Sequence, residues 1–480
     1  MVIDPQELGV QARERWALAV LAGLLNGVGF IFWGPMSLVA NVPLLLALRQ
    51  SSSATETALL GGLVGLLGGV HIYGIVNYGW FLLIGFSVYT ASQMVIYATL
   101  FRLLRGSKWP WLEVLLPASL WTLSEWIRTV GPLSMPASYA GNIADTVWLQ
   151  PWMQLASITG GIGVSTMVAA IQGVLFFALI GNASQKRAAA GVFLMLLALG
   201  VVGAYIAPED EDRDLSIIAV QGGLANSQYH AAQADPAAMR DVVKTYEILS
   251  QKAYAQGPDL VIWPETAIRA PVLSAPDLRE RLFPQKGNKT TLMAGLIETD
   301  LRGRRYNVIS VATEAGVIDR YAKYRLVPGT EDHFTAGEGF RPVDTPHGKV
   351  GALICLESVY PDGARTLAEN GAELLVVASN DAGFGWSPIT EHMTNRAIVR
   401  AVETQRWLIR VGQAGVSTVI SPRGSIEKRL ELFKPGLLSA QVERRHDKSI
   451  FVQWGDWWII VILILLVAAP LTRNRDSVPG

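Results

Sequence analysis

Residues 350–357 read Val-Gly-Ala-Leu-Ile-Cys-Leu-Glu, an apolar run with the length of a buried strand that ends on Cys355. Cys355 is the only cysteine among the 480 residues, so an intramolecular disulfide is excluded. Catalytic side chains are often found where the strands of an α/β sheet give way to loops. The stretch therefore predicts an α/β domain with a thiol at its functional edge.

On both sides of this run, from Leu215 onward, short β-rich runs alternate with helix-like stretches. The periodicity predicts strands over 215–222, 258–264, 291–297, 306–313, 349–355, 373–379, 407–413 and 416–421, and helices over 236–255, 360–370 and 388–405. About 240 residues are enough for one layered domain with its own core. The hairpin-like regions 291–313 and 407–421 favour a mixed sheet over an all-parallel one.

Two further polar residues follow predicted strands. Glu265 comes directly after the run Leu260-Val-Ile-Trp-Pro264, and Lys323 lies in Tyr321-Ala-Lys-Tyr-Arg-Leu-Val-Pro328, after a strand pair. A thiol is mostly protonated near neutral pH, so it needs a base to take its proton and a cation to favour the thiolate. Glu265 and Lys323 can supply these groups, and the three residues together predict acyl transfer at Cys355.

Each of the three residues alone also fits a plainer role. A cysteine ending an apolar strand is commonly a small core residue, a glutamate after Trp-Pro a solvated cap, and a lysine in a polar loop a surface charge. The catalytic interpretation therefore depends on their occurring together. The sequence has no dinucleotide-binding glycine motif, no phosphate-binding loop and no paired histidines, so we expect neither a cofactor nor a metal.

The composition points to a membrane protein. Half of the residues are hydrophobic, only 17% are charged, and the mean hydropathy is positive. Forty basic residues balance forty acidic ones, so nothing in the charge indicates a nucleic-acid partner. The composition changes sharply at Pro208-Glu-Asp-Glu-Asp-Arg-Asp214, a charged linker that we interpret as a domain boundary.

Eight apolar runs are long enough, or nearly so, to cross a hydrocarbon core of ~30 Å, which takes ~20 helical residues. They are 16–34, 36–49, 57–77, 79–104, 109–128, 151–181, 187–206 and 455–472. With eight spans, the short loops rich in Lys and Arg fall on one side, which the positive-inside rule assigns to the cytoplasm together with both termini. We therefore expect membrane helices over 1–207, an extracytoplasmic catalytic domain over 208–452, and a closing helix with a cytoplasmic tail over 453–480.

The order and context of the polar residues resemble the nitrilase superfamily, whose Glu-Lys-Cys triad follows strand ends on an α-β-β-α sandwich. The matching segments are Trp263-Pro-Glu265-Thr-Ala267, Lys323 with Leu326-Val-Pro328, Ile354-Cys355-Leu-Glu357, Ser379-Asn-Asp-Ala382 and the helix from Arg396 to Arg406. The resemblance implies a multi-pass α-helical membrane domain joined to a nitrilase-type α/β sandwich.

From end to end, the layout of helices and domain resembles the apolipoprotein N-acyltransferase family. Glu331 fits that family's Leu-Val-Pro-Phe-Gly-Glu pattern, although Gly329-Thr330 stands here for Phe-Gly, and Leu356 stands where the family commonly has tyrosine. These departures leave the shape of the loop open and remove an aromatic neighbour of the nucleophile. Neither changes a residue of the triad.

This resemblance implies a ping-pong acyltransferase that needs no metal or nucleotide. Glu265 would take the thiol proton, and Cys355 would remove an acyl chain from a membrane phospholipid as a thioester. The acceptor would be the α-amine of the S-diacylglyceryl N-terminal cysteine of an apolipoprotein, the last step of lipoprotein maturation. Lys323 and the backbone N–H of Leu356 would hold the oxyanion. The enzyme would lie in the bacterial inner membrane, with its catalytic domain in the periplasm.

Other residues have open roles. Glu331 and Glu357 could orient Lys323 and tune the triad, or could be structural ion-pair partners. Because both substrates keep their chains in the bilayer, the loop residues Phe334, Phe384 and Trp386 could reach toward lipid, although ordinary core or loop packing is the more frequent role of such residues. The mechanism requires no partner domain, so a monomer is expected.

Two rival functions remain at this point. In the first, a membrane-tethered nitrilase or amidase hydrolyses a small amide, with water resolving the thioester. In the second, a transporter or sensor uses a nitrilase-like domain only to bind its ligand. Charges inside membrane spans would favour the second, and Glu113 and Glu125 are the candidates.

Overall fold

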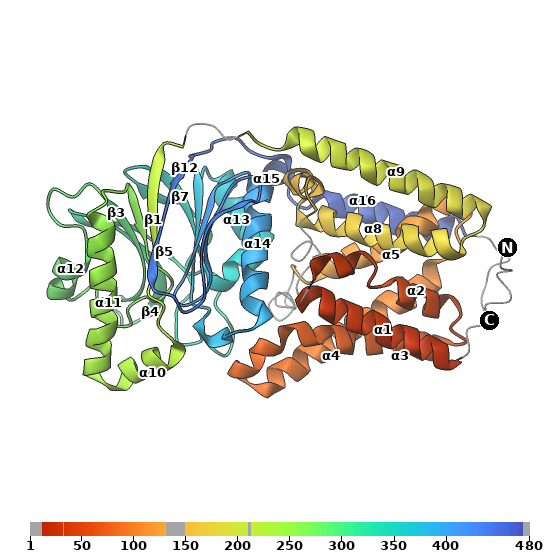
Figure 1. The fold of residues 1–480 in the computed structure, drawn as a ribbon, viewed down its shortest axis with the longest axis horizontal. Coiled ribbons are helices and arrows are strands. Elements are labelled where there is room, and N and C mark those ends of the chain that lie inside the picture. The colour runs from red at the N-terminus through yellow and green to blue at the C-terminus, as the bar shows by residue number, and fades with distance from the viewer. Residues whose placement is uncertain (1–11, 32, 131–148, 210–212, 474–480) are drawn as a thin grey trace. The chain divides into compact units, whose positions relative to one another are not determined.

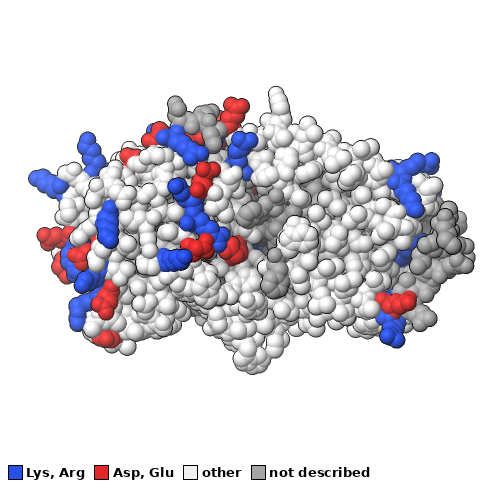
Figure 2. Space-filling model, in the orientation of Figure 1, with Lys and Arg blue, Asp and Glu red and all other residues white. Residues whose placement is uncertain are grey.

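The computed structural model describes residues 12–31, 33–130, 149–209 and 213–473, and the chain divides into two compact units (Figure 1). The helical unit comprises Met1–Ala207 and Asp456–Gly480, and the sandwich unit comprises Pro208–Gly455. Figure 2 shows charged side chains spread over the sandwich unit, whereas most of the visible face of the helical unit is uncharged. Uncharged surface of this extent is typical of a protein in contact with lipid.

The helical unit is built from α-helices and short 3₁₀ turns. In chain order they are α1 (Ala12–Ile31), η1 (Gly34–Leu38), α2 (Val42–Arg49), α3 (Ala54–Gly68), η2 (Gly69–Tyr78), α4 (Trp80–Leu104), α5 (Pro110–Ile127), η5 (Trp152–Leu155), α7 (Ala156–Thr159), α8 (Gly161–Ile180), α9 (Ala183–Ile206) and α16 (Trp457–Leu471). Among the described residues, four stretches are long and apolar enough to cross a membrane: Ala54–Tyr78, Trp80–Leu104, Gly161–Ile180 and Ala183–Ile206.

Two of the remaining predicted spans are helical but short. Gly34–Arg49 and Trp457–Leu471 are apolar helical segments below full spanning length. The predicted span 151–181 is wrong as one helix, because Gly160, at φ +72°, separates α7 from α8. The full set of eight spans, and the topology counted from it, therefore stays a prediction.

Glycines allow α3 and α4 to pack closely. Gly61 and Gly65 lie one turn apart on α3, and a Cβ at Gly65 would come within 2.3 Å of the Thr90 carbonyl oxygen. The Thr90 hydroxyl donates to the Gly65 carbonyl at 2.9 Å. Small residues are what membrane helices use to bring backbones together, because lipid provides no hydrophobic driving force between helices.

The carboxylates predicted inside the fifth span are held by local contacts. Glu113 accepts hydrogen bonds from the backbone N–H groups of Gly106 and Ser107, each at 2.8 Å. Glu125 accepts from the indole N–H of Trp121 at 2.8 Å. Glu113 therefore ties the loop before α5 to the helix, whereas the Glu125 contact lies within α5 itself.

The sandwich unit contains two mixed sheets of six strands each within its described residues. Its elements are β1 (Leu215–Gln221), α10 (Asn226–Ala234), α11 (Pro236–Tyr254), β2 (Leu260–Ile262), α12 (Pro276–Leu282), β3 (Thr291–Thr299), β4 (Arg305–Thr313), β5 (Gly316–Ala322), β6 (Val343–Thr345), β7 (Gly348–Ile354), η6 (Cys355–Val359), α13 (Pro361–Glu369), β8 (Leu374–Ser379), η7 (Ala382–Phe384), α14 (Pro388–Thr404), β9 (Leu408–Gly412), β10 (Ser417–Ile420), β11 (Ile426–Leu430), β12 (Gly436–Val442) and α15 (Ile450–Trp454). The strand orders are β12-β1-β2-β3-β4-β5 and β11-β10-β9-β8-β7-β6.

The two sheets pack face to face and helices cover their outer faces. Buried side chains of both sheets, such as Ile262 and Ile354, form one core between them. A second core joins α11 to the first sheet, and a third joins α13 and α14 to the second. Figure 1 shows α11 on one side of the paired sheets and α14 on the other. This arrangement confirms the predicted α-β-β-α sandwich.

The strands that the sequence did not predict are the edge strands. All eight predicted strands occur, and the four missed ones, β5, β6, β11 and β12, end the two sheets. Edge strands bury fewer side chains and carry more charge, as in the β11 sequence Ile-Glu-Lys-Arg-Leu, so their apolar pattern is weak. The short helices α10, α12 and α15 were missed as well.

We predict that Gly65→Ala destabilises the helical unit. The added methyl would meet backbone atoms of α4, and overpacking of this kind costs about 1–3 kcal/mol. The thermal unfolding midpoint in detergent should fall relative to wild type. Gly191→Ala in α9 is the matched control, because nothing lies within 4 Å of its added Cβ. Equal midpoints for the two variants would contradict the close packing of α3 and α4.

Candidate active site

Glu265 is delivered by the end of β2 in the middle of the first sheet. The Trp263 side chain is buried and its indole N–H donates to Ser250 at 3.0 Å, which anchors the loop. Gly295 of β3 lies so close that a Cβ there would be 2.1 Å from the Pro264 carbonyl oxygen. This close approach turns the Glu265 side chain, which is only 5% exposed, toward the other site residues.

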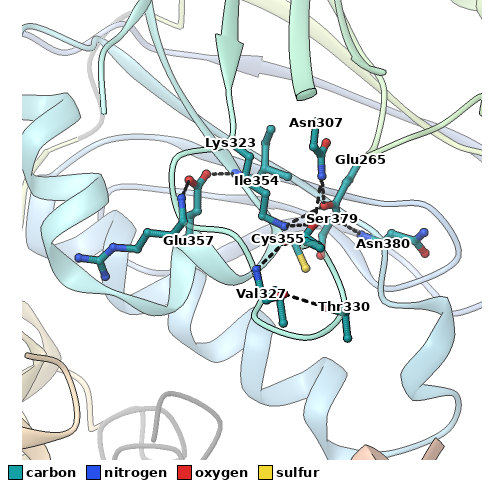
Figure 3. Close-up of polar contacts among 12 residues, drawn as sticks. Glu265, Asn307, Lys323, Val327, Thr330, Ile354, Cys355, Glu357, Ser379 and Asn380 are labelled. Carbon is teal, nitrogen blue, oxygen red and sulfur yellow. Dashed lines mark hydrogen bonds and ion pairs between the residues drawn. The ribbon is translucent and has the colours of Figure 1, made fainter. Parts of the chain in front are cut away.

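Lys323 follows β5 and is almost fully buried, at 1% exposure. Its backbone N–H donates to the Asn307 carbonyl on β4 at 2.8 Å, which fixes where the side chain begins. Its ammonium nitrogen lies 3.1 Å from Glu265 Oε1 (Figure 3) and 2.8 Å from Glu331 Oε1. The structure thus places one ammonium between two carboxylates.

Asn307 joins the same two carboxylates. Its side-chain N–H₂ donates to Glu265 Oε1 at 2.7 Å and to Glu331 Oε1 at 3.3 Å. The second oxygen of Glu265 accepts the backbone N–H of Asn380 at 3.0 Å, and that of Glu331 accepts the N–H of Val327 at 2.8 Å. Every carboxylate oxygen in this cluster therefore has a donor, as buried charges require.

The charges around Lys323 outweigh its burial. Burial alone would favour the neutral amine, but Glu265, then Cys355 and Glu331, favour the charged form and raise the pKa of Lys323 above its ordinary value. The lysine is consequently an ammonium across the accessible pH range. It provides a fixed positive charge at the site.

Cys355 stands at the sharp turn where β7 passes into η6. Its φ is +53°, a left-handed value that is rare for a residue with a side chain and recurs at functional sites. In Figure 3 the sulfur lies beside Lys323 and Glu265. Burial raises the pKa of the Cys355 thiol, as does the charge of Glu265, while Lys323 opposes the rise. The resting thiol is therefore protonated near neutral pH, with a base and a cation next to it.

Glu357 lies apart from the charged cluster and braces the turn instead. Its Oε1 accepts from the Tyr321 hydroxyl and from the N–H groups of Tyr324 and Arg325, at 2.8, 2.8 and 3.0 Å. Its Oε2 accepts the N–H of Ile354 at 2.8 Å. Burial raises the pKa of Glu357, and these donors oppose that rise. One buried carboxylate thus fastens the lysine segment to the nucleophile turn.

The predicted residues therefore separate into groups. Glu265 and Glu331 both contact Lys323. Cys355 lies beside Lys323 and Glu265, whereas Glu357 bonds to the backbone of the nucleophile turn. The Leu356 side chain is buried, and its N–H is in the first turn of η6, where helical N–H groups lack intrahelical partners.

Other residues depart from the sequence-based expectations. Asn307 was missed, although an asparagine between the apolar residues of a predicted strand is a signal that could have marked it. Phe384 is buried, so its predicted reach toward lipid is wrong. Trp386 is 74% exposed, and Phe334 is partly buried against Arg305 and His333. The described residues contain no group of His, Cys, Asp or Glu suited to a metal.

Comparison with known proteins connects both units to one family. The carbon-nitrogen hydrolase family model matches residues 227–446, and the model for the apolipoprotein N-acyltransferase N-terminal domain matches residues 22–174. Over nearly its whole length the chain is similar to apolipoprotein N-acyltransferases. It is thus an acyltransferase that carries a carbon-nitrogen hydrolase fold.

Relatives of this acyltransferase family match nearly the whole chain. The apolipoprotein N-acyltransferase of Geobacter metallireducens is 28% identical over 97% of this chain and 96% of its own length. The relative from Shewanella oneidensis is 26% identical and covers 95% of this chain and 96% of its own length. The relative from Azotobacter vinelandii is 29% identical and covers 96% of each chain. Among solved structures, the carbon-nitrogen hydrolase from Helicobacter pylori G27 is 17% identical, with a TM-score of 0.38, and covers 54% of this chain and 94% of its own.

We predict that Glu357→Gln loosens the nucleophile turn. The amide nitrogen would face a backbone N–H in place of an acceptor, and an unsatisfied buried group costs about 1–3 kcal/mol. The thermal unfolding midpoint in detergent should fall, and the rate of iodoacetamide labelling of Cys355 should rise. Glu280→Gln on α12 is the matched control, because Glu280 is exposed. If the unfolding midpoint of Glu357→Gln equals that of wild type, Glu357 does not stabilise the nucleophile turn.

Proposed function

We propose that this enzyme moves a fatty acyl chain from a membrane phospholipid to the α-amine of the S-diacylglyceryl N-terminal cysteine of apolipoproteins. The observation that carries the proposal is the Lys323 ammonium, held by Glu265 and Glu331 beside the only thiol of the chain. Relatives that match nearly the whole chain, each named an apolipoprotein N-acyltransferase, support an apolipoprotein amine as the acceptor.

In the first half-reaction, Glu265 takes the proton of Cys355 as the sulfur attacks the ester carbonyl of the phospholipid. The carbonyl oxygen becomes an oxyanion, and the Lys323 ammonium and the Leu356 N–H stabilise it. When the tetrahedral intermediate collapses, the C–O bond breaks and protonated Glu265 returns its proton to the leaving alkoxide. The products are a lysophospholipid and an acyl thioester on Cys355.

In the second half-reaction, the free α-amine of the lipoprotein attacks the thioester carbonyl. Glu265 accepts a proton from the amine, and the same donors hold the second oxyanion. Collapse breaks the C–S bond, gives the amide, and returns Cys355 to its thiol form with the proton from Glu265. The ester bond consumed in the first step is replaced by an amide, so no external energy source is required.

The electrostatics of the site fit this division of labour. A raised thiol pKa keeps Cys355 protonated until the donor is bound, so the proton leaves as the C–S bond forms. A raised lysine pKa keeps Lys323 charged, which excludes it as the base and suits it to the oxyanion. Glu331 and Asn307 hold the ammonium and the base in position and do not react themselves.

We place the enzyme in the bacterial inner membrane as a multi-pass monomer. Support comes from the four long apolar helices and from relatives that are bacterial enzymes acting on lipid-modified proteins by name. In this proposal residues 1–207 and 453–480 hold the membrane helices, both termini are cytoplasmic, and the catalytic domain 208–452 faces the periplasm. The compact unit Pro208–Gly455 coincides closely with that domain.

The decisive experiment is mass spectrometry of the purified enzyme after incubation with phosphatidylethanolamine and no acceptor. Wild type should gain one acyl-sized adduct that hydroxylamine removes and that disappears when a diacylglyceryl peptide is added. Cys355→Ala should gain none. Lys323→Met should form the adduct about 10²–10³-fold more slowly, as expected for loss of one oxyanion donor.

A different pattern would favour the rival function. If phospholipid leaves no adduct while a simple amide is hydrolysed by wild type and not by Cys355→Ala, the chain is a membrane-tethered amidase. The chain has no second thiol, so a thioester adduct can form only on Cys355.

A further inference from the structure

Ser379 ends β8 beside the strand that delivers the nucleophile. Strands β7 and β8 are parallel with Ile354 opposite Ala378, so Cys355 and Ser379 leave the same sheet edge side by side. Figure 3 shows the two residues as neighbours. The Ser379 side chain is fully buried, and its hydroxyl donates to Asp381 Oδ1 at 2.5 Å. Because the hydroxyl donates its hydrogen bond to Asp381, its oxygen lone pairs point toward its other neighbours.

Asp381 is itself held by a buried ion pair. Its Oδ2 accepts from the guanidinium of Arg410 on β9, and both side chains are completely inaccessible to solvent. Gly415 packs against it so closely that an added Cβ would lie 2.7 Å from the Asp381 Cβ. The pair is therefore rigid, and Arg410 neutralises a charge that would otherwise stand unpaired near the thiol.

Several charged groups face Cys355. Glu265 after β2, Lys323 after β5 and Asp381 after β8 act on its thiol. Glu331 pairs with Lys323, Arg410 pairs with Asp381, and Glu357 stands in the turn of Cys355 itself. After burial and Glu265, which raise the thiol pKa, Lys323 lowers it, Asp381 raises it and the Ser379 hydroxyl lowers it. Ser379 and Asp381 thus act on the thiol in opposite directions.

We propose that Ser379 is a positioning residue for Cys355, and that the buried Asp381–Arg410 pair sets which way its hydroxyl points. In the resting enzyme the hydroxyl donates to Asp381. When Glu265 removes the thiol proton, the hydroxyl rotates and donates to the thiolate, while Asp381 keeps its hydrogen bond with Arg410. The proposal rests on Cys355 being the nucleophile of the proposed function.

No proton is lost or gained in this exchange. The thiol proton goes to Glu265, and Ser379 keeps its own proton and only changes acceptor. Because Arg410 remains bonded to Asp381, the carboxylate is not left without a partner when the hydroxyl turns away. The Ser379 hydroxyl therefore donates to the Cys355 sulfur only when the sulfur is a thiolate. Such a donor stabilises the reactive thiolate and not the resting thiol.

The test is the pH dependence of iodoacetamide labelling of the full-length protein in detergent without phospholipid. Ser379→Ala should move the apparent pKa of labelling up by about one unit, which is about a tenfold slower rate below that pKa. Ser358→Ala is the matched control, because Ser358 is also buried beside Cys355 but donates to its carbonyl oxygen, at 2.8 Å. Its profile should coincide with that of wild type.

Two further variants separate positioning from a merely structural role. Asp381→Asn removes the negative charge that disfavours the thiolate and keeps the positive charge of Arg410. The apparent pKa of Cys355 labelling should therefore move down, opposite to its shift in Ser379→Ala. Ser379→Thr keeps the hydroxyl and should restore the wild-type profile. An unmoved profile for Ser379→Ala, or shifts in the same direction for Ser379→Ala and Asp381→Asn, would overturn the proposal. If Asp381→Asn does not fold, the Ser379→Ala and Ser379→Thr pair decides.

The labelling assay separates this inference from the proposed function. It contains neither donor nor acceptor, so a missing acyl adduct would refute the acyltransferase mechanism without affecting the profiles. Conversely, if the acyl adduct forms but the Ser379→Ala labelling profile equals that of wild type, the acyltransferase mechanism stands and the proposed role of Ser379 is refuted.

Discussion

The site depends on one ammonium buried between two carboxylates. Taking a charge out of water costs several kcal/mol, and only close partners with full hydrogen bonding offset that cost. Lys323 meets this condition through Glu265 and Glu331, and Asn307 completes the cluster by donating to both carboxylates. Removal of Lys323 would leave two carboxylates buried without a cation, so the segments that carry these residues must be held in register.

The sandwich provides that register. Inner strands of two facing sheets, each paired in parallel with a neighbour, deliver Glu265 and Cys355. The lysine segment leaves an edge strand, where the backbone is free to turn. Glu357 then ties the lysine segment to the nucleophile turn with four hydrogen bonds. The left-handed backbone at Cys355 persists because this brace and the strand behind it determine the turn from both sides.

The sequence predicted the central strands because buried strands have a strong apolar pattern, and Glu265 and Cys355 were singled out because each follows one of them. Lys323 follows the edge strand β5 and was singled out by its motif instead. The sequence did not predict the edge strands, whose exposed faces weaken the apolar pattern. The roles of Asn307 and of the hydrogen-bonded side chains Ser379, Asp381 and Arg410 were missed. These roles are set by pairing between strands, which no local sequence pattern records. Phe384 was assigned to the surface from its loop position, although the loop folds inward.

The central claim is that this cluster makes Cys355 a covalent acyl carrier. The most direct measurement is the amount of lysophospholipid released per enzyme molecule when phospholipid is added without an acceptor. The account predicts a rapid release that stops at one equivalent in wild type and is absent in Glu265→Gln, because the acyl chain remains on the sulfur until an amine arrives. Continuous release without an acceptor would contradict it, since water would then be resolving the thioester.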